Sequence, residues 1–145
     1  MKRLVRILVL AAFGLTARRI GAQDASAYKV IVNVSNPTTQ LSRLKLGEMF
    51  LKKTPRWADG HPIQPVEPPG KSPVRQRFDL EIFGKQVIAV SAYWQQMIFS
   101  GKGVPPPERS NDADIVAFVR ETPGAVGYVA AGTDVSGVRV VAITD

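Results

Sequence analysis

The chain has 145 residues, enough for one domain, and its hydrophobic content of 45% allows an ordinary buried core without covalent cross-links. It contains no cysteine, which excludes disulfides, thiolate catalysis, cysteine-based zinc sites and a lipid-modified N-terminal cysteine. The formal net charge of +7 is typical of nucleic-acid-binding proteins, but the position of the cations along the chain argues against that class.

The N-terminal segment has the order of regions found in a secretory signal peptide. Two cations precede an apolar stretch over residues 4–17, and small residues follow near Ala22. This stretch is shorter than the roughly 18 apolar residues that span a bilayer. We therefore expect residues 1–22 to be a cleaved signal peptide, with cleavage as late as residue 27 as an alternative. An uncleaved membrane anchor is the less favoured interpretation.

The charge of the remaining chain is close to balanced. Five of the 19 Lys and Arg residues lie before Ala22, namely Lys2, Arg3, Arg6, Arg18 and Arg19. Without them, 14 cations stand against 12 Asp and Glu residues, which leaves a net charge of +2. We therefore expect a periplasmic or otherwise extracytoplasmic protein. It should have no nucleic-acid partner and no stable membrane insertion after cleavage.

The first part of the mature chain predicts a strand, a helix and a second strand. Residues 28–34 form a β-branched run typical of a buried strand. Apolar residues at near-helical spacing over residues 40–53 predict a helix capped by Thr39 or Ser42. Two prolines confine the short extended segment over residues 62–66 to a sheet edge.

Two helices are expected next. Over residues 72–83, Ser72 supplies a hydroxyl N-cap and Pro73 takes the first helical position, where proline is favoured. Gly84 ends this helix, and another is expected over residues 87–99.

The C-terminal part predicts one helix and two closing strands. Ser110 or Asn111 caps the helix, and strands follow over residues 125–129 and 138–143. The order β-α-β-α-α-α-β-β implies an α/β fold in which helices flank a mixed β-sheet. We expect residues 28–145 to form this one domain.

The most informative segment for function lies between the second strand and the second helix. Gly70, Lys71 and Ser72 match the end of a nucleotide-binding phosphate loop. The first glycine of that loop is replaced by Pro65, and the two prolines before Gly70 remove backbone amides that would hold phosphates. The segment therefore does not predict a nucleotide triphosphatase.

An anion is still favoured at this helix N-terminus, which presents unpaired N–H groups and partial positive charge. Ser72 can donate its hydroxyl, and Lys71 and Arg75 add positive charge. Together with Gly70, these residues form a candidate ligand-binding site. The alternative is an ordinary helix cap with solvated basic neighbours.

The remaining candidates do not assemble a catalytic or metal site. His61, the single histidine, lies between Gly60 and Pro62 and is expected in an exposed turn without a second ligand. The Ser-x-x-Lys spacing of Ser42 and Lys45 is read as coincidence. Five aromatic residues are expected to serve in packing, the alternative being a binding platform: Trp57, Tyr93, Trp94, Phe99 and Tyr128. We expect no enzyme activity, no cofactor and no metal.

Three segments resemble the phosphate-binding proteins of ABC transporters, a family of type 2 periplasmic binding proteins. They are the Leu-Ser to Trp-Ala-Asp-Gly pattern over residues 41–60, Ile-Phe-Ser-Gly-Lys-Gly over residues 98–103, and Thr-Pro-Gly-Ala-Val-Gly-Tyr over residues 122–128. The resemblance extends over roughly residues 28–143. It implies the fold of one lobe of such a protein and export from the cytoplasm.

Full-length members of this family have two lobes and bind phosphate between them. The family's Ser-Gly-Thr at a helix start corresponds here to Lys71, Ser72 and Pro73, of which only the serine is shared. The resemblance implies weak binding of phosphate or a related oxyanion, linked to ABC-type uptake. An ABC permease or a second copy of the chain would close the site. The alternative is an envelope protein-interaction module that keeps the lobe fold without a ligand.

Overall fold

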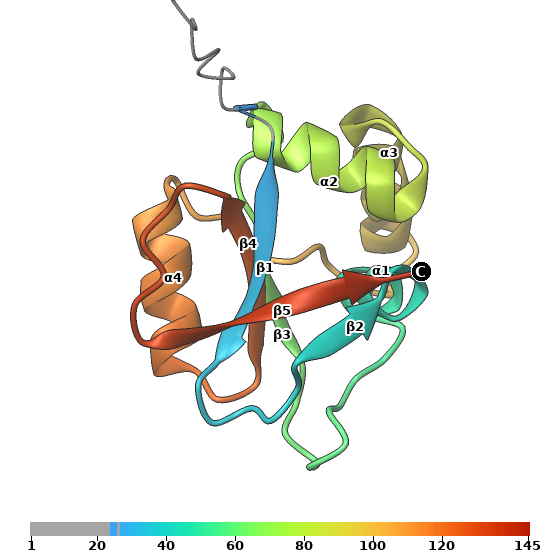
Figure 1. The fold of residues 1–145 in the computed structure, drawn as a ribbon. Helices are drawn as coiled ribbons and strands as arrows, with labels where there is room; N and C mark the ends of the chain where they lie inside the picture. Colours follow the sequence, from blue (N-terminus) through green and yellow to red (C-terminus); the bar gives the residue numbers. More distant parts are fainter. Residues whose placement is uncertain (1–23, 26) are drawn as a thin grey trace, which may run out of the picture.

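A five-stranded mixed sheet forms the centre of the fold (Figure 1), in a computed structural model that describes residues 24, 25 and 27–145. The expected signal peptide lies outside the described residues. The strands are β1 (Tyr28–Asn33), β2 (Gln40–Ser42), β3 (Gln64–Val66), β4 (Ala125–Ala130) and β5 (Val138–Thr144). Their order across the sheet is β2-β5-β1-β4-β3. The central β1 is antiparallel to β4 and β5, while the edge strands β2 and β3 run parallel to β5 and β4.

Helices cover both faces of this sheet, so the described residues form three layers. They are α1 (Arg43–Phe50), α2 (Pro73–Phe83), α3 (Val87–Phe99) and α4 (Asp112–Glu121). The α4 helix packs on one face against β1 and β4, and α1 and α2 pack on the other. Figure 1 shows α3 at the periphery, beside α2 and away from the sheet.

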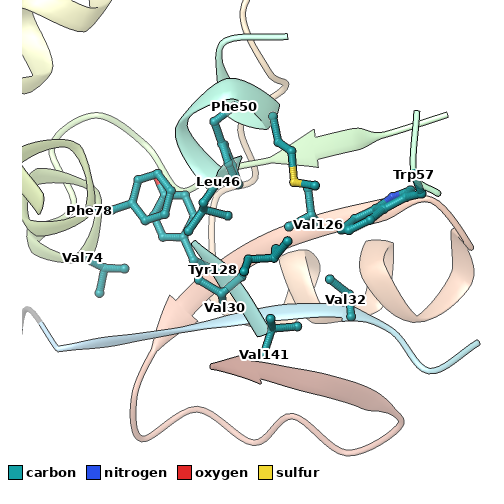
Figure 2. Packing of buried hydrophobic residues seen from close by; sticks show 12 residues of the cluster. Val30, Val32, Leu46, Phe50, Trp57, Val74, Phe78, Val126, Tyr128 and Val141 are labelled. Atoms are coloured by element: carbon teal, nitrogen blue, oxygen red, sulfur yellow. The ribbon is translucent and has the colours of Figure 1, made fainter. Parts of the chain in front are cut away.

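Side chains of β1 point alternately to the two faces of the sheet, so this strand contributes to the core on each face. Val30 and Val32 enter the core beneath α1 and α2, while Ile31 enters the core beneath α4. In the larger core, the ring of Tyr128 stacks on that of Phe78 with centroids 3.7 Å apart and planes 3° apart. Figure 2 shows these rings together with Leu46 and Phe50 of α1. The aromatic contacts therefore join α1 and α2 to β4.

The predicted mixed sheet and helices are confirmed, with one correction. Residues 40–42 were expected to start the first helix, but they form β2, which pairs with the last strand, β5. Ser42 is the N-cap, because its side chain accepts a hydrogen bond from the backbone N–H of Lys45. The bond involves only the backbone of Lys45, so this role of Ser42 does not depend on a lysine three residues later. A long-range strand pairing has overridden a local helical pattern.

The Pro-Gly-Ala-Val-Gly-Tyr segment meets its neighbours at very short range. A Cβ atom on Gly124 would lie 1.9 Å from the carbonyl oxygen of Pro62. The indole N–H of Trp57 donates to the Gly124 carbonyl oxygen at 2.9 Å. Farther along, a Cβ on Gly127 would lie 3.0 Å from side-chain carbons of Ile115 and Val66. These glycines are required for close packing around β3 and β4.

Replacing Gly124 with alanine should therefore destabilise the protein severely. A methyl group cannot occupy space 1.9 Å from a backbone oxygen, so β3 and β4 would have to separate. We expect a loss of about 3 kcal/mol or more in the free energy of unfolding, measured by urea denaturation. Gly103→Ala is the matched control, because its Cβ would meet no atom closer than 3.8 Å. Similar stabilities for the two variants would contradict the close approach.

Candidate functional site

The loop between β3 and α2 carries the predicted anion-binding residues. Gly70, Lys71 and Ser72 are consecutive, with Lys71 exposed and Ser72 half-buried. The backbone N–H of Ser72 donates to the Pro69 carbonyl oxygen at 2.9 Å, which fixes the turn. We refer to Gly70, Lys71 and Ser72 as the basic loop.

Ser72 takes the N-cap position, but its side chain does not cap the helix. Its backbone is extended, with φ of −65° and ψ of 133°, and no capping bond forms from the hydroxyl. The sequence prediction of a hydroxyl cap is therefore wrong, although the helix begins at Pro73 as expected. Because Pro73 fixes the first helical position by its ring geometry, the helix start does not require the hydroxyl.

The first turn of α2 adds donors to the basic loop. By helix geometry, the N–H groups of Val74 and Arg75 have no intrahelical acceptor, while the N–H of Gln76 is the first to bond, to the Ser72 carbonyl oxygen at 3.0 Å. The helix dipole places partial positive charge at the same point. The Ser72 hydroxyl and the exposed Lys71 belong to the residues directly before this turn, so the loop offers backbone donors, a hydroxyl and a positive charge to a small anion.

Gly70 ties the basic loop to α3. A Cβ atom on Gly70 would lie 3.2 Å from a methyl carbon of Val87, the first residue of α3. The backbone of the loop therefore lies directly against the start of α3, which limits its freedom to move.

The guanidinium group of Arg75 is buried and paired, and does not extend beside Lys71. Its Nε lies 3.0 Å from a carboxylate oxygen of Asp79, and its Nη1 lies 2.8 Å from one of Glu67. Nη1 also donates to the Pro68 carbonyl oxygen at 3.2 Å. A third carboxylate, that of the more exposed Glu108, lies 3.7 Å from Nη1. The structure thus brings three of the four predicted residues together and places the Arg75 side chain in an ionic cluster below them.

Sequence reasoning missed the two buried carboxylates of this cluster, Glu67 and Asp79. The spacing of Arg75 and Asp79 by four residues is the one signal that could have revealed part of it, because such pairs face one another on a helix. Glu67 gives no comparable signal, because it lies eight residues before Arg75 and outside α2, directly after β3.

Burial dominates the electrostatics of the cluster. It raises the pKa of Glu67 to about 8, with the negative charges of Asp79 and Glu108 adding to the effect and Arg75 opposing it. Burial also raises the pKa of Asp79, against the attraction of Arg75. Two buried carboxylates thus share one guanidinium, so the cluster favours a proton on Glu67 over full ionisation.

The other sequence candidates have structural roles or are exposed. His61 is exposed, and its Nδ1 lies 3.1 Å from a carboxylate oxygen of Asp59. Trp57, Trp94 and Tyr128 are buried, which confirms the packing role expected for them, whereas Phe99 is 89% exposed. Within residues 24, 25 and 27–145, no group of three or more His, Asp or Glu side chains is arranged to hold a metal.

The three-layer fold defines a class of structure that comparison with solved proteins identifies. The chain has the fold of one lobe of the phosphate-binding proteins of ABC transporters, so the resemblance noted from its motifs is confirmed at the level of the fold. The sequence itself matches no family model and no curated protein.

Three solved structures illustrate the likeness. An ABC-type phosphate transport receptor from Vibrio cholerae is 17% identical with a TM-score of 0.65, and the match covers 82% of this chain and 47% of the receptor. A possible phosphate-binding protein from Planctomyces limnophilus is 21% identical with a TM-score of 0.62, over 82% of this chain and 42% of that one. A Clostridium perfringens protein assigned as a phosphate ABC transporter substrate-binding protein, solved with bound phosphate, is 18% identical with a TM-score of 0.63, over 81% and 44%. The present chain thus spans less than half the length of these proteins.

The raised pKa of Glu67 predicts that stability falls as the pH rises. Below about pH 4.5 Glu67 is protonated in both the folded and the unfolded chain, and between pH 4.5 and 8 only the folded chain keeps the proton. The free energy of unfolding should therefore decrease by about 2–4 kcal/mol between pH 5 and pH 8 in urea titrations. Asp79 acts in the same direction.

Glu67→Gln should remove most of this pH dependence, because a neutral amide replaces the titrating carboxyl group. Glu121→Gln, on the exposed end of α4, is the control and should keep the wild-type slope. A wild-type protein that is equally stable at pH 5 and pH 8 would contradict the assigned pKa.

Proposed function

We propose that the chain is an exported, solute-binding-like protein that binds phosphate or a related oxyanion weakly at the basic loop. The observation that carries the proposal is the convergence of donors there: the exposed Lys71, the Ser72 hydroxyl, which makes no capping bond, and the first N–H groups of α2. The fold supports the same function, because the three solved structures above are described as phosphate transport or phosphate-binding proteins. The role of Arg75 in this site is its backbone N–H, since its side chain is paired elsewhere.

Binding at a single lobe should be weak. Three or four charge-assisted hydrogen bonds of roughly 1.5–3 kcal/mol each are opposed by an association cost of about 4 kcal/mol or more. The difference corresponds to a dissociation constant between about millimolar and tens of micromolar. Tighter binding needs an ABC permease or a second copy of the chain to close over the loop. The site has no nucleophile and base in place, so the proposed role is transport-linked binding and not catalysis.

The proposed location is the periplasm or another extracytoplasmic compartment. The order of cations, apolar stretch and small residues over residues 1–22 supports export. Among the described residues, no helix has the length and hydropathy needed to cross a membrane.

One observation favours a second candidate function, an envelope protein-interaction module without a ligand. The side-chain charge of Arg75, which the sequence assigned to the anion, is already satisfied by Glu67 and Asp79. The net charge around the loop is therefore less positive than the sequence predicts.

Phosphate should raise the melting temperature of the protein if the basic loop binds it. At ten times the dissociation constant, the stabilisation is about 1.4 kcal/mol, or roughly 4–8 °C. Ser72→Ala with Lys71→Ala should abolish this response. Ser72→Ala alone should leave the stability of the unliganded protein within about 0.5 kcal/mol, because the hydroxyl makes no capping bond.

Chloride at matched ionic strength is the control for the phosphate effect, because a basic loop responds to any salt. Lys102→Ala removes a distant exposed cation and should keep the full response. Arg75→Ala is unsuitable, because it would leave two buried carboxylates without their partner. A response to phosphate no larger than that to chloride would reject the anion site and favour the interaction module.

If the chain is exported, its signal peptide should be removed at a defined position. The protein recovered from the envelope should begin between residues 23 and 28, as cleavage falls between Ala22 and Ala27. Intact mass or N-terminal sequencing measures this directly. Recovery from the cytoplasm with Met1 retained would contradict the prediction.

A further inference from the structure

The α3 helix exposes large apolar side chains on the side that faces solvent, where they lie beside the uncharged polar residues Ser91 and Gln95. None of its 13 residues is charged. Val90 and Trp94 are buried toward the protein, whereas Ile88 and Phe99 are 77% and 89% exposed. At 100° per residue, Ile88, Ala92 and Phe99 lie within about 40° of one another, roughly opposite the buried pair. Large apolar side chains that are exposed together on one side of a helix indicate a surface that a partner covers.

Neighbouring residues extend this outer side of α3. Leu80 of α2 is 56% exposed and lines the same surface depression as Ile88. We call Leu80, Ile88, Ala92 and Phe99 the α3 surface. Because Ile88 and Phe99 lie at opposite ends of α3, the exposed apolar side chains extend over more of the surface than a small ligand covers.

Cations stand at both ends of the α3 surface. Residues 84–107 include Lys85 and Lys102 and no Asp or Glu. Lys71 is a third exposed cation, carried by the loop that packs against Val87. Among the described residues, no carboxylate lies within ion-pair distance of these three lysines. The α3 surface is therefore complementary to a partner that offers apolar groups to Ile88 and Phe99 and negative charges to the lysines.

We propose that the α3 surface docks onto a membrane surface rich in anionic phospholipid. Ile88 and Phe99 would enter the boundary between head groups and acyl chains, as the apolar side of an interfacial helix does. The three lysines would lie among the phosphate groups of the lipid heads, where each cation adds to binding. Contact through a few exposed side chains is reversible, so the protein would exchange between the membrane and the surrounding water.

The charges disfavour a second copy of the chain as the partner. Antiparallel packing of two α3 helices with Ile88 against the partner's Phe99 sets Lys85 opposite the partner's Lys102, and parallel packing sets each lysine against its counterpart. The area is also small, because a helix of this length is about 20 Å long and covers less than the roughly 800 Å² per partner of a standard interface.

A single fluorescent label can test the docking, because the chain contains no cysteine. In the full chain, Ala92→Cys carries a polarity-sensitive fluorophore between Ile88 and Phe99. Its emission should shift to the blue with vesicles of phosphatidylglycerol and phosphatidylcholine, much less with phosphatidylcholine alone, and less at high salt. Adding Ile88→Ser and Phe99→Ser should lower the partition coefficient by roughly 10-fold or more. Lys85→Ala with Lys102→Ala should lower it several-fold.

Val34 provides the matched controls. It is 58% exposed and follows the end of β1 that points away from α2 and α3 (Figure 1). Val34→Ser in the Ala92→Cys background should leave partitioning unchanged, and a label at Val34→Cys should stay in water. Far-ultraviolet circular dichroism confirms that each variant is folded.

Three results would overturn the proposal. They are no emission change with either vesicle, an equal change at Val34→Cys, and a concentration-dependent change without lipid. The second would indicate attachment through the apolar N-terminal stretch, and the third would indicate self-association. Free inorganic phosphate tests the basic loop separately, so a thermal response to phosphate without vesicle binding rejects this proposal and keeps the proposed function.

Discussion

The pairing of Arg75 with Glu67 and Asp79 joins α2 to the end of β3, and the position of the candidate site depends on this connection. Glu67 directly follows β3, while Arg75 and Asp79 lie on α2, so one guanidinium fixes the helix to the end of the strand. The basic loop joins these two elements and takes its position from them. A buried cation that loses its carboxylates is far more costly than a missing surface contact. The orientation of the basic loop is therefore determined by the buried charges of Arg75, Glu67 and Asp79.

Much of the fold could be predicted because its strongest signals are local. The β-branched run of β1, the proline and glycine that bound α2, and the apolar α3 each specify their own structure. The edge strand β2 could not be predicted, because its three residues are strand only through pairing with β5 about 100 residues later. The Pro-Gly-Ala-Val-Gly-Tyr motif, the most specific point of resemblance, is explained by close packing at Gly124 and Gly127. It therefore marks the fold and carries no information about the ligand.

The sequence shows that the candidate residues are neighbours, but it does not show their electrostatics. The sequence places Lys71, Ser72 and Arg75 within five consecutive residues but does not show which way each side chain turns. Arg75 turns inward because Glu67 and Asp79 supply its partners, and Lys71 stays outside because nothing buried pairs with it. The same limit applies to α3, whose apolar sequence predicts a helix but not that Ile88 and Phe99 remain uncovered.

The central position of β1 has a consequence for how the chain reaches its folded state. Among the described residues, the first strand is flanked by the last two, β4 and β5, and the register pairs Tyr28 with Ala130 and Val30 with Val141. The sheet therefore cannot close until residues 125–144 are available, and contacts of such long sequence separation make folding slow. A chain threaded through a membrane from its N-terminus would stay open until its last strands emerge. For a chain exported as proposed above, slow closure of this kind would maintain the extended form that translocation needs.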